Sequence, residues 1–248
     1  MLMIEPETAV FGDIHSNLEA LEAVFADMDA IGIRDRVCLG DIIGYAANPS
    51  QCLELVQSTG CQVLKGNHDA WVADDSALDE LRDVARSGIE FSREKLTPEQ
   101  RGYLAALPLV ISDDKRQNVH ASLDAPSEWP YVAEERDARD HFRSQARPIC
   151  FCGHTHVPRV WHQDADGDIR SWRGEGRIEL PSGGKSLINA GSVGQPRDLC
   201  PDACYVVFDA GWRWVEFRRV PYDVGKTKRK IMRAKLPRFT AQRLSLGR

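Results

Sequence analysis

The chain has 248 residues, of which 42% are apolar and 28% charged, and its formal net charge is −5. This composition suits one globular domain with a substantial core and argues against a second full domain. No apolar run approaches the roughly 18 residues of a membrane span, and residues 1–7 lack the basic-then-apolar layout of a signal peptide. We therefore expect a cytoplasmic protein with no membrane partner, folded as a single domain over residues 1–248.

Basic residues are concentrated at the end of the chain, where residues 226–248 contain nine Lys or Arg and no acidic residue. Such a tail can bind nucleic acid or an anionic surface. Here the cations interleave with Val224, Ile231 and Leu236 at helical spacing, and the rest of the chain is acidic. We therefore predict a basic C-terminal helical segment at about residues 223–248 with a solvated face, and we do not expect nucleic acid as a partner.

The seven cysteines include no C-x-x-C pair of the kind that holds zinc or carries out redox chemistry. Cys150 and Cys152 alternate in a strand-like run, which places both on one face of that strand. We interpret the cysteines as ordinary buried thiols.

The first third of the chain alternates strand and helix patterns. Short apolar runs at residues 8–11, 36–39 and 62–64 predict strands, and two helical patterns at residues 17–30 and 49–57 separate them. Such a β-α-β-α-β order predicts a parallel sheet with right-handed crossovers.

The pattern then becomes helical over residues 76–107, with a clear helix start at residues 97–100, before it changes to strands. Strands are predicted at residues 109–111, 118–120, 148–152, 159–161, 187–189, 205–208 and 214–217. The glycines of residues 183–186 resemble a P-loop only superficially, since a strand follows them, and we interpret them as a hairpin turn. Together the elements favour an α/β fold with two stacked sheets and outer helices.

Residues that can bind metal follow the ends of these predicted strands. They are Asp13, His15, Asp41, Asn67, His120, His154 and His156. In an open α/β sheet, ligands bind at the carboxyl ends of the strands, so these distant positions are expected to converge. Taken singly, a histidine is usually structural, an aspartate can cap a turn, and an asparagine can occupy one. Their combination favours a metal site.

Local spacing supports this interpretation. In Asp13-Ile14-His15 and His154-Thr155-His156, one residue separates the two polar side chains, which points both the same way on an extended backbone. A glycine stands directly before each of four groups of candidate ligands, where it permits a sharp turn. These glycines are Gly12, Gly40, Gly66 and Gly153.

The segments that carry these residues are Gly12–Asn17, Gly40–Tyr45, Gly66–Asp69, Val119–Ser122 and Gly153–His156. In this order they resemble the calcineurin-like metallophosphoesterase superfamily, in particular its small bacterial and archaeal phosphodiesterase-type branch. The resemblance implies a four-layer α/β/β/α sandwich of two mixed β-sheets flanked by helices. It also implies one metal held by Asp13, His15, Asp41 and His156, and a second held by Asp41, Asn67, His120 and His154.

The resemblance further implies a reaction in which a hydroxide bridging two metals, roughly 3.5–4 Å apart, attacks a phosphate ester. His68 is similar to the family's catalytic histidine, and Asp69 either orients it or begins a helix. The imidazole ligands argue against Mg²⁺ and Ca²⁺ and favour two divalent transition-metal ions, Mn or Fe first, with Zn, Co or Ni as alternatives.

Asn17, Asn189 and Arg197 are the candidate substrate contacts. Some family members carry Gly-Asp-x-x-x-Arg-Gly in the second segment and Gly-Asn-His-Glu in the third, whereas this chain has neither the arginine nor the glutamate. Arg197 or Lys65 could replace that arginine. Trp129, Pro130 and Tyr131 are interpreted as packing residues, with a wall of the substrate pocket as the alternative.

We therefore expect a phosphoesterase acting on a small phosphodiester, phosphomonoester or nucleotide. The alternatives are a dinucleoside-polyphosphate hydrolase, which the missing arginine disfavours, and a non-catalytic metal-binding regulatory protein on the same fold. The sequence does not set the oligomeric state.

Overall fold

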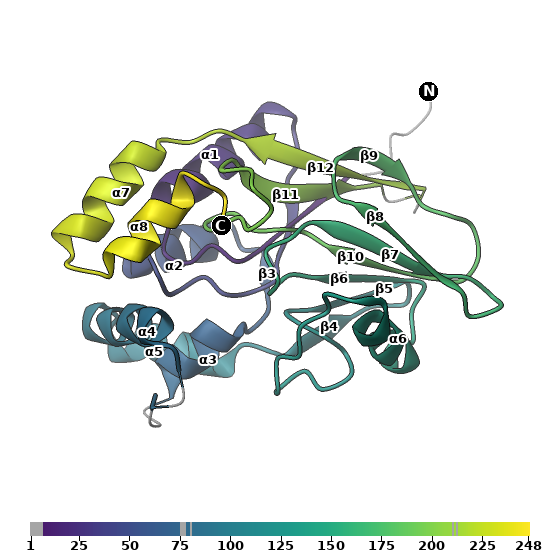
Figure 1. Cartoon of the computed structure of the whole chain (residues 1–248), viewed down its shortest axis with the longest axis horizontal. Helices are drawn as coiled ribbons and strands as arrows, with labels where there is room; N and C mark the ends of the chain where they lie inside the picture. Colours follow the sequence, from purple (N-terminus) through teal and green to yellow (C-terminus); the bar gives the residue numbers. More distant parts are fainter. Residues whose placement is uncertain (1–6, 75–77, 80, 210, 212) are drawn as a thin grey trace.

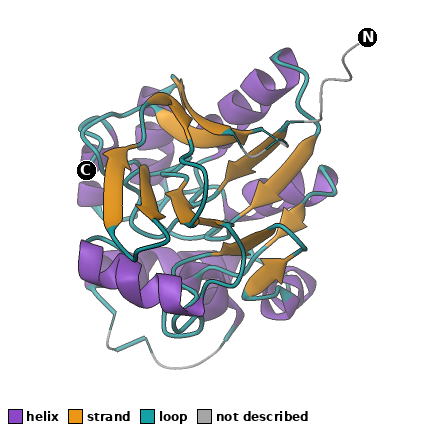
Figure 2. Ribbon diagram, turned by 90° about the vertical axis from the view of Figure 1, so that its right-hand side faces the viewer, coloured by secondary structure: helices purple, strands orange, loops and turns teal. Residues whose placement is uncertain are grey.

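Two six-stranded sheets face each other at the centre of the fold (Figures 1 and 2). They are seen in a computed structural model that describes residues 7–74, 78–79, 81–209, 211 and 213–248. The first sheet contains β1 (Thr8–Phe11), β2 (Asp35–Cys38), β3 (Gln62–Val63), β9 (Gly176–Glu179), β11 (Ala203–Phe208) and β12 (Trp214–Val220), in the order β3-β2-β1-β11-β12-β9. The second contains β4 (Val110–Ser112), β5 (Arg116–Val119), β6 (Ile149–Cys152), β7 (Arg159–Gln163), β8 (Ile169–Arg173) and β10 (Lys185–Asn189), in the order β4-β5-β6-β10-β7-β8.

Each sheet mixes parallel and antiparallel pairs. β1, β2 and β3 are parallel, as the alternating pattern at the start of the chain predicts, and β11 joins β1 in antiparallel register. In the second sheet β5, β6 and β10 are parallel, while β4, β7 and β8 pair in antiparallel register. The parallel strands occupy one side of the first sheet and the centre of the second, and their carboxyl ends meet at one edge of the fold.

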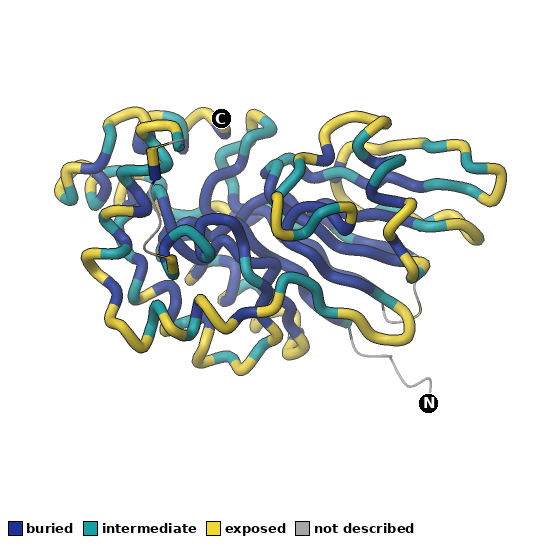
Figure 3. Tube along the Cα trace, turned by 90° about the horizontal axis from the view of Figure 1, so that it is seen from below, coloured by how far each residue is buried: buried dark blue, intermediate teal, exposed yellow. Residues whose placement is uncertain are grey.

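Side chains alternate between the two faces of each central strand and form separate cores. In β1, Ala9 and Phe11 pack on the helix-covered side, while Val10 faces the other sheet. In β11, Val207 joins the first core and Val206 the second. Figure 3 shows that the buried residues follow these strands. The four-layer α/β/β/α sandwich is thereby confirmed.

Helices cover the outer faces and one end of the sheets (Figure 1). They are α1 (Leu18–Ala30), α2 (Pro49–Ser58), α3 (Asn67–Ala73), α4 (Asp83–Lys95), α5 (Pro98–Ala106), α6 (Glu135–Ser144), α7 (Val224–Arg233) and α8 (Arg238–Leu244). Local sequence explains their starts: Asn17 caps α1 by accepting from the N–H of Ala20, and Thr97 forms a capping box with Gln100 at α5. No helix in the described part of the chain has the length and apolar character needed to cross a membrane.

The predicted elements are largely present, with instructive differences. α4 and α5 occupy the region predicted as helical, although residues 76, 77 and 80 lie outside the described residues. β8, β9 and α6 were not predicted, because β8 and β9 are mostly exposed edge strands and α6 buries only three side chains. The basic segment at the C-terminus forms two helices, α7 and α8, rather than one.

Candidate metal centre

The seven predicted ligands converge where the carboxyl ends of strands from both sheets meet. Asp13 and His15 follow β1, Asp41 follows β2, and Asn67 begins α3 directly after β3. His120 follows β5, and His154 and His156 follow β6. All seven side chains are at most 7% exposed. Residues up to 143 positions apart in the chain therefore form one buried cluster.

The loops that carry the ligands depart from extended backbone. Asp13, His15, Asp41, His154 and His156 all have φ between 49° and 65°, a region that residues with a Cβ rarely occupy. Hydrogen bonds hold the first loop in this conformation, since the N–H groups of both Ile14 and His15 donate to the carbonyl of Asp41 at 2.9 Å. The prediction of extended backbone between paired ligands was therefore wrong, although both side chains of each pair do enter the cluster. Such strain is typical of functional sites.

Two of the glycines make room for the carboxylates. A Cβ on Gly66 would collide with Asp41 Oδ1, and a Cβ on Gly153 would collide with Asp13 Oδ2. Close approach of the backbone, rather than a positive φ, therefore requires glycine at these two positions.

Each aspartate uses one oxygen within the protein and presents the other to the cluster. Asp13 Oδ2 accepts from the N–H of His154 at 3.0 Å, and Asp41 Oδ1 accepts from the N–H of His68 at 2.8 Å. The remaining oxygens, Asp13 Oδ1 and Asp41 Oδ2, are buried and have no hydrogen-bond partner among the described residues. A buried carboxylate oxygen without a partner is costly unless a cation neutralises it.

The histidines present lone pairs to the same space. Nδ1 of His15, His120 and His156 donates to the carbonyls of Ile43, Leu39 and Gln195, respectively. A carbonyl can only accept, so each of these imidazoles carries its proton on Nδ1 and an unprotonated Nε2. This is the tautomer in which Nε2 binds metal, held by a backbone carbonyl as in many metalloproteins.

The distances between these acceptor atoms are short, so a cation is the species expected in the space between them. His15 Nε2 lies 3.1 Å from His156 Nε2, and His156 Nε2 lies 3.2 Å from Asp13 Oδ1. Nearby, Asp41 Oδ2 lies 3.5 Å from Nε2 of His15 and 3.5 Å from Nε2 of His120. Lone pairs facing one another at such distances repel, whereas a metal ion between them converts repulsion into coordination. The donor set therefore fits divalent metal.

Burial shifts the pKa values of the candidate ligands away from their ordinary values. Burial raises the pKa of Asp13 to about 6, and it raises the pKa of Asp41, an effect to which the charges of Asp69 and Asp13 add. Burial also lowers the pKa of His15, which keeps its imidazole neutral and able to coordinate. Bound metal ions would supply the positive charge that both buried aspartates need in order to stay ionised.

His68 lies beside the cluster, and Asp69 lies beneath it. His68 is buried, its Nδ1 has no hydrogen-bond partner among the described residues, and its ring packs 4.7 Å from His15 and 5.3 Å from Trp71. Its side chain also lines the pocket that opens over the ligands. Asp69 instead accepts backbone N–H groups of Gly66 and of residues 41–43. Asp69 therefore holds a ligand loop in place and does not orient His68.

Two of the three predicted substrate contacts point into the protein interior and do not line the pocket. The side chain of Asn17 donates to the carbonyl of Gly194 and to Tyr222, and that of Asn189 donates to the carbonyl of Gly153. Both are buried, so we now give Asn17 and Asn189 structural roles. Arg197 does line the pocket.

Other pocket residues differ from the sequence expectations. Lys65 donates to the carbonyl of Ala105, away from the pocket, and so does not replace the missing arginine. Trp129 and Tyr131 both line the pocket, and the Tyr131 ring stacks 4.1 Å from that of His154. Sequence reasoning missed Arg243, which reaches the pocket from α8.

Comparison with known proteins agrees with this geometry. Residues 7–211 match the model of the calcineurin-like phosphoesterase superfamily domain. The chain belongs to this superfamily. As a calcineurin-like phosphoesterase with buried His and Asp clusters, the protein has the features of a divalent-metal-binding hydrolase.

Three relatives cover nearly the whole chain. An uncharacterised protein of Methanocaldococcus jannaschii is 38% identical over 99% of this chain and 100% of its own. The crystal structure of a metallophosphoesterase from Sphaerobacter thermophilus is 35% identical, with a TM-score of 0.87 over 98% of this chain and 99% of that one. A hypothetical protein of Pyrococcus horikoshii OT3, 22% identical, has the same fold, with a TM-score of 0.79 over 98% of both chains.

Proposed function

We propose that this calcineurin-like phosphoesterase hydrolyses a small phosphorylated compound by using two divalent metal ions. One ion would be held by Asp13, His15, Asp41 and His156, and the other by Asp41, Asn67, His120 and His154. The observation that carries the proposal is the position of Asp41 Oδ2, which is buried, unpartnered among the described residues and 3.5 Å from an imidazole of each group. One carboxylate oxygen between two sets of donors is what a bridging ligand requires.

When bound, the ions supply positive charge that polarises the phosphate and acidifies the attacking water. The protein positions the other participants. His68 lies where it can donate a hydrogen bond to a phosphate or leaving-group oxygen, and Arg197 offers a guanidinium from the same pocket. The water oxygen bonds to phosphorus as the ester P–O bond breaks, and the leaving oxygen takes up a proton.

The ligand set favours transition metals. Four imidazoles bind Mn, Fe, Co, Ni or Zn more readily than Mg²⁺ or Ca²⁺, which prefer oxygen ligands. We propose Mn or Fe as the metal used.

The test compares Asp41→Asn with a control variant, Asp166→Asn, which changes an exposed aspartate away from the cluster. We expect the Mn-loaded protein to hydrolyse bis-p-nitrophenyl phosphate, Asp41→Asn to lose about 1,000-fold in turnover, and Asp166→Asn to match the wild type. By mass spectrometry, we expect two metal ions per chain in the wild type and fewer in Asp41→Asn. Undiminished turnover in Asp41→Asn contradicts the proposal, as does stoichiometric metal binding with no hydrolysis of any phosphoester across a broad panel.

A further inference from the structure

A cavity of about 630 Å³ opens directly over the metal ligands. Asn67, His68 and His154 form its floor, and the rest of its lining comes from distant parts of the chain. Its size lies within the range typical of small-molecule sites. The side chains that line its walls therefore indicate which phosphorylated compound the cavity can bind.

Helix α8 forms one wall of this cavity. Thr240, Ala241 and Leu244 are buried on one side of α8 and help to pack it against the rest of the protein. Phe239 and Arg243, four residues apart on the other side, line the cavity instead. The helix is thus anchored on one face and presents an aromatic ring and a guanidinium on the other.

The segment that carries Arg197 connects α8 to the metal ligands. The N–H of Arg197 donates to the carbonyl of His156 at 3.2 Å, and two residues later the N–H of Leu199 donates to the carbonyl of Gly247 at 2.9 Å. These two bonds hold the end of the chain at a set position relative to the cluster. Arg243 is therefore a fixed part of the cavity wall.

Among the described residues, no Asp or Glu side chain pairs with either of the two guanidiniums in the cavity. Arg197 donates to Gln195 Oε1 at 3.0 Å, and its Nε is buried without a hydrogen-bond partner in that part of the chain. Arg243 Nε donates to the main-chain oxygen of Arg248, which engages one edge of this guanidinium. Burial lowers the pKa of Arg243 to about 10, and the positive charge of Arg197 contributes to the shift. Glu128, the acidic residue of the lining, is exposed. Two neighbouring cations beside a metal centre favour a ligand with more than one negative charge.

Aromatic rings make up much of the remaining wall. Trp71, Trp129, Tyr131 and Phe239 line the cavity from three separate segments of the chain. Tyr131 and Phe239 are 54% and 55% exposed, although large aromatic side chains are usually well covered. Planar rings of this kind stack on nucleobases whatever the sequence of the base.

We propose that the cavity binds a nucleotide, with Arg197 and Arg243 contacting its phosphate and the aromatic side chains receiving its base. The inference names the substrate class of the proposed phosphoesterase and rests on that function only for the hydrolysis step. Binding itself follows from the cavity wall. Arg243 and Phe239 are the specificity-determining residues that α8 contributes.

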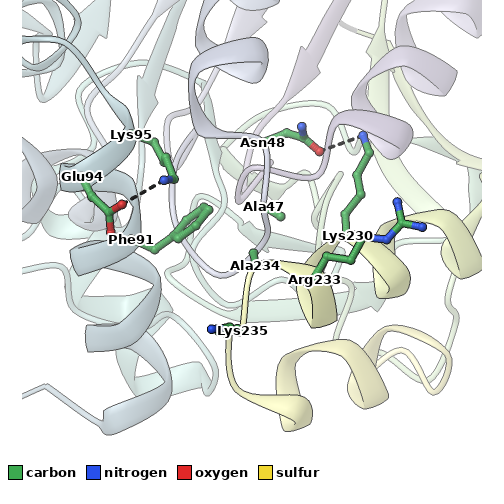
Figure 4. A pocket seen from close by; sticks show the side chains of 9 residues that line it. All are labelled: Ala47, Asn48, Phe91, Glu94, Lys95, Lys230, Arg233, Ala234 and Lys235. Carbon is green, nitrogen blue, oxygen red and sulfur yellow. Dashed lines mark hydrogen bonds and ion pairs between the residues drawn. The ribbon is translucent and has the colours of Figure 1, made fainter.

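A second basic hollow lies between α4 and α7 and supplies a control (Figure 4). Two of its cations are already partnered: Lys95 pairs with Glu94 at 2.9 Å, and Lys230 donates to Asn48 at 2.9 Å and pairs with Glu19. Arg233 lines this hollow and is absent from the lining of the cavity over the metal ligands. Arg233→Ala therefore removes one arginine from the same basic segment without touching the proposed site.

The test measures binding by calorimetry on the Mn-loaded protein with two probes that cannot be hydrolysed. One is the phosphonate analogue of adenosine monophosphate, in which carbon replaces the ester oxygen, and the other is methylphosphonate, which has the anion without the base. We expect Arg243→Ala to weaken binding of both probes by about 10- to 100-fold, because it removes a charged hydrogen-bond donor. Phe239→Leu is expected to weaken only the adenosine probe, by about tenfold.

Three further measurements keep the outcome interpretable. Arg233→Ala should bind both probes as the wild type does, and Arg243→Lys, which keeps the charge without the planar fork, should lie between wild type and Arg243→Ala. Melting temperatures establish that each variant is folded. Wild-type affinity of folded Arg243→Ala for both probes would overturn the inference, as would equal affinity of the wild type for the two probes.

The same preparations are assayed with bis-p-nitrophenyl phosphate. If the protein hydrolyses this ester but Arg243→Ala leaves its nucleotide affinity unchanged, the inference is refuted and the proposed function stands. Nucleotide binding that depends on Arg243, without turnover of any phosphoester, supports the cavity and refutes the proposed function.

Discussion

The carboxylate of Asp69 accepts the backbone N–H of Asp41 at 2.7 Å. The same carboxylate accepts the N–H groups of Ile42 at 3.0 Å, Ile43 at 3.3 Å and Gly66 at 3.0 Å. Asp41 is itself held in a left-handed conformation, with φ of 51°. One buried side chain thereby fixes the loop that presents the proposed bridging carboxylate.

Asp69→Ala is expected to destabilise the protein and to weaken metal binding together. Four backbone donors lose their acceptor in a fully buried site, which costs about 3 kcal/mol or more of unfolding free energy. Denaturant unfolding of chelated protein measures the stability, and metal titration measures the affinity. Asp69→Asn keeps one acceptor oxygen and should show a smaller loss in both. A variant that loses only turnover, with stability and metal content intact, would instead indicate direct participation of Asp69 in catalysis.

Gly66→Ala and Gly102→Ala are expected to have opposite effects. The new Cβ at position 66 meets Asp41 Oδ1, so the proposed bridging carboxylate must shift, and we expect reduced metal content with a stability loss of about 2 kcal/mol. At position 102, within α5, nothing lies within 4 Å of the new Cβ, and the change should stabilise the protein by about 0.5–1 kcal/mol. Denaturant melts and elemental analysis check both. Full metal occupancy in Gly66→Ala would show that the ligand geometry tolerates the shift.

Removing metal is expected to lower the melting temperature, and adding Mn²⁺ back should restore it. The ion binds the folded ligands and stabilises the native state by about 2.7 kcal/mol at a concentration 100 times its dissociation constant. Because His156 Nε2 lies 3.1 Å from His15 Nε2, His156→Ala relieves part of the repulsion in the metal-free protein and should shrink the difference between chelated and loaded samples.

A matched control uses a buried histidine outside the cluster. His162, in β7, bonds to Ser186 at 3.0 Å, and His162→Ala should keep the full difference between chelated and loaded protein whatever it does to absolute stability. Equal shifts in His156→Ala and in the wild type would contradict the ligand assignment.

The ligand cluster was predictable because topology, rather than fine detail, brings it together. Parallel strands end at a common edge, so residues such as Asp13, Asp41 and His120 converge once the strands are recognised. Asn17, also a candidate substrate contact, instead caps α1 and donates to the carbonyl of Gly194, because a cap residue directly after a ligand loop serves the helix. The left-handed backbone of the ligand loops was equally invisible in the sequence, because it depends on hydrogen bonds between Ile14 and Asp41, 27 residues apart.

Arg243 shows where sequence reasoning ended. Its surroundings in the chain are a basic helix, for which a solvated face is the usual explanation. This arginine faces the cavity because Leu244 packs in the core and because the N–H of Leu199 donates to the carbonyl of Gly247. Both contacts are tertiary and do not show in the sequence. β8 was missed for a related reason, since four of its five residues are exposed and its sequence lacks the apolar alternation of a half-buried strand.

His141 is expected to make the protein sensitive to acid through a group remote from the metal ligands. Burial lowers its pKa to about 4, and Nδ1 accepts the N–H of Leu123 at 3.2 Å, which requires the neutral ring. The unfolded chain takes up this proton near pH 6.5, while the folded protein does so only near pH 4. Stability is therefore full above pH 6.5 and falls by about 3 kcal/mol as the pH drops to 4.

His141→Gln removes this titration and should flatten the curve between pH 6.5 and 4 by that amount relative to the wild type. Denaturant unfolding of both proteins in chelator, at half-unit steps of pH, isolates the difference, because the metal-binding histidines titrate equally in each. Parallel curves for the two proteins would show that His141 is already protonated in the folded state, in which case Leu123 must find another acceptor.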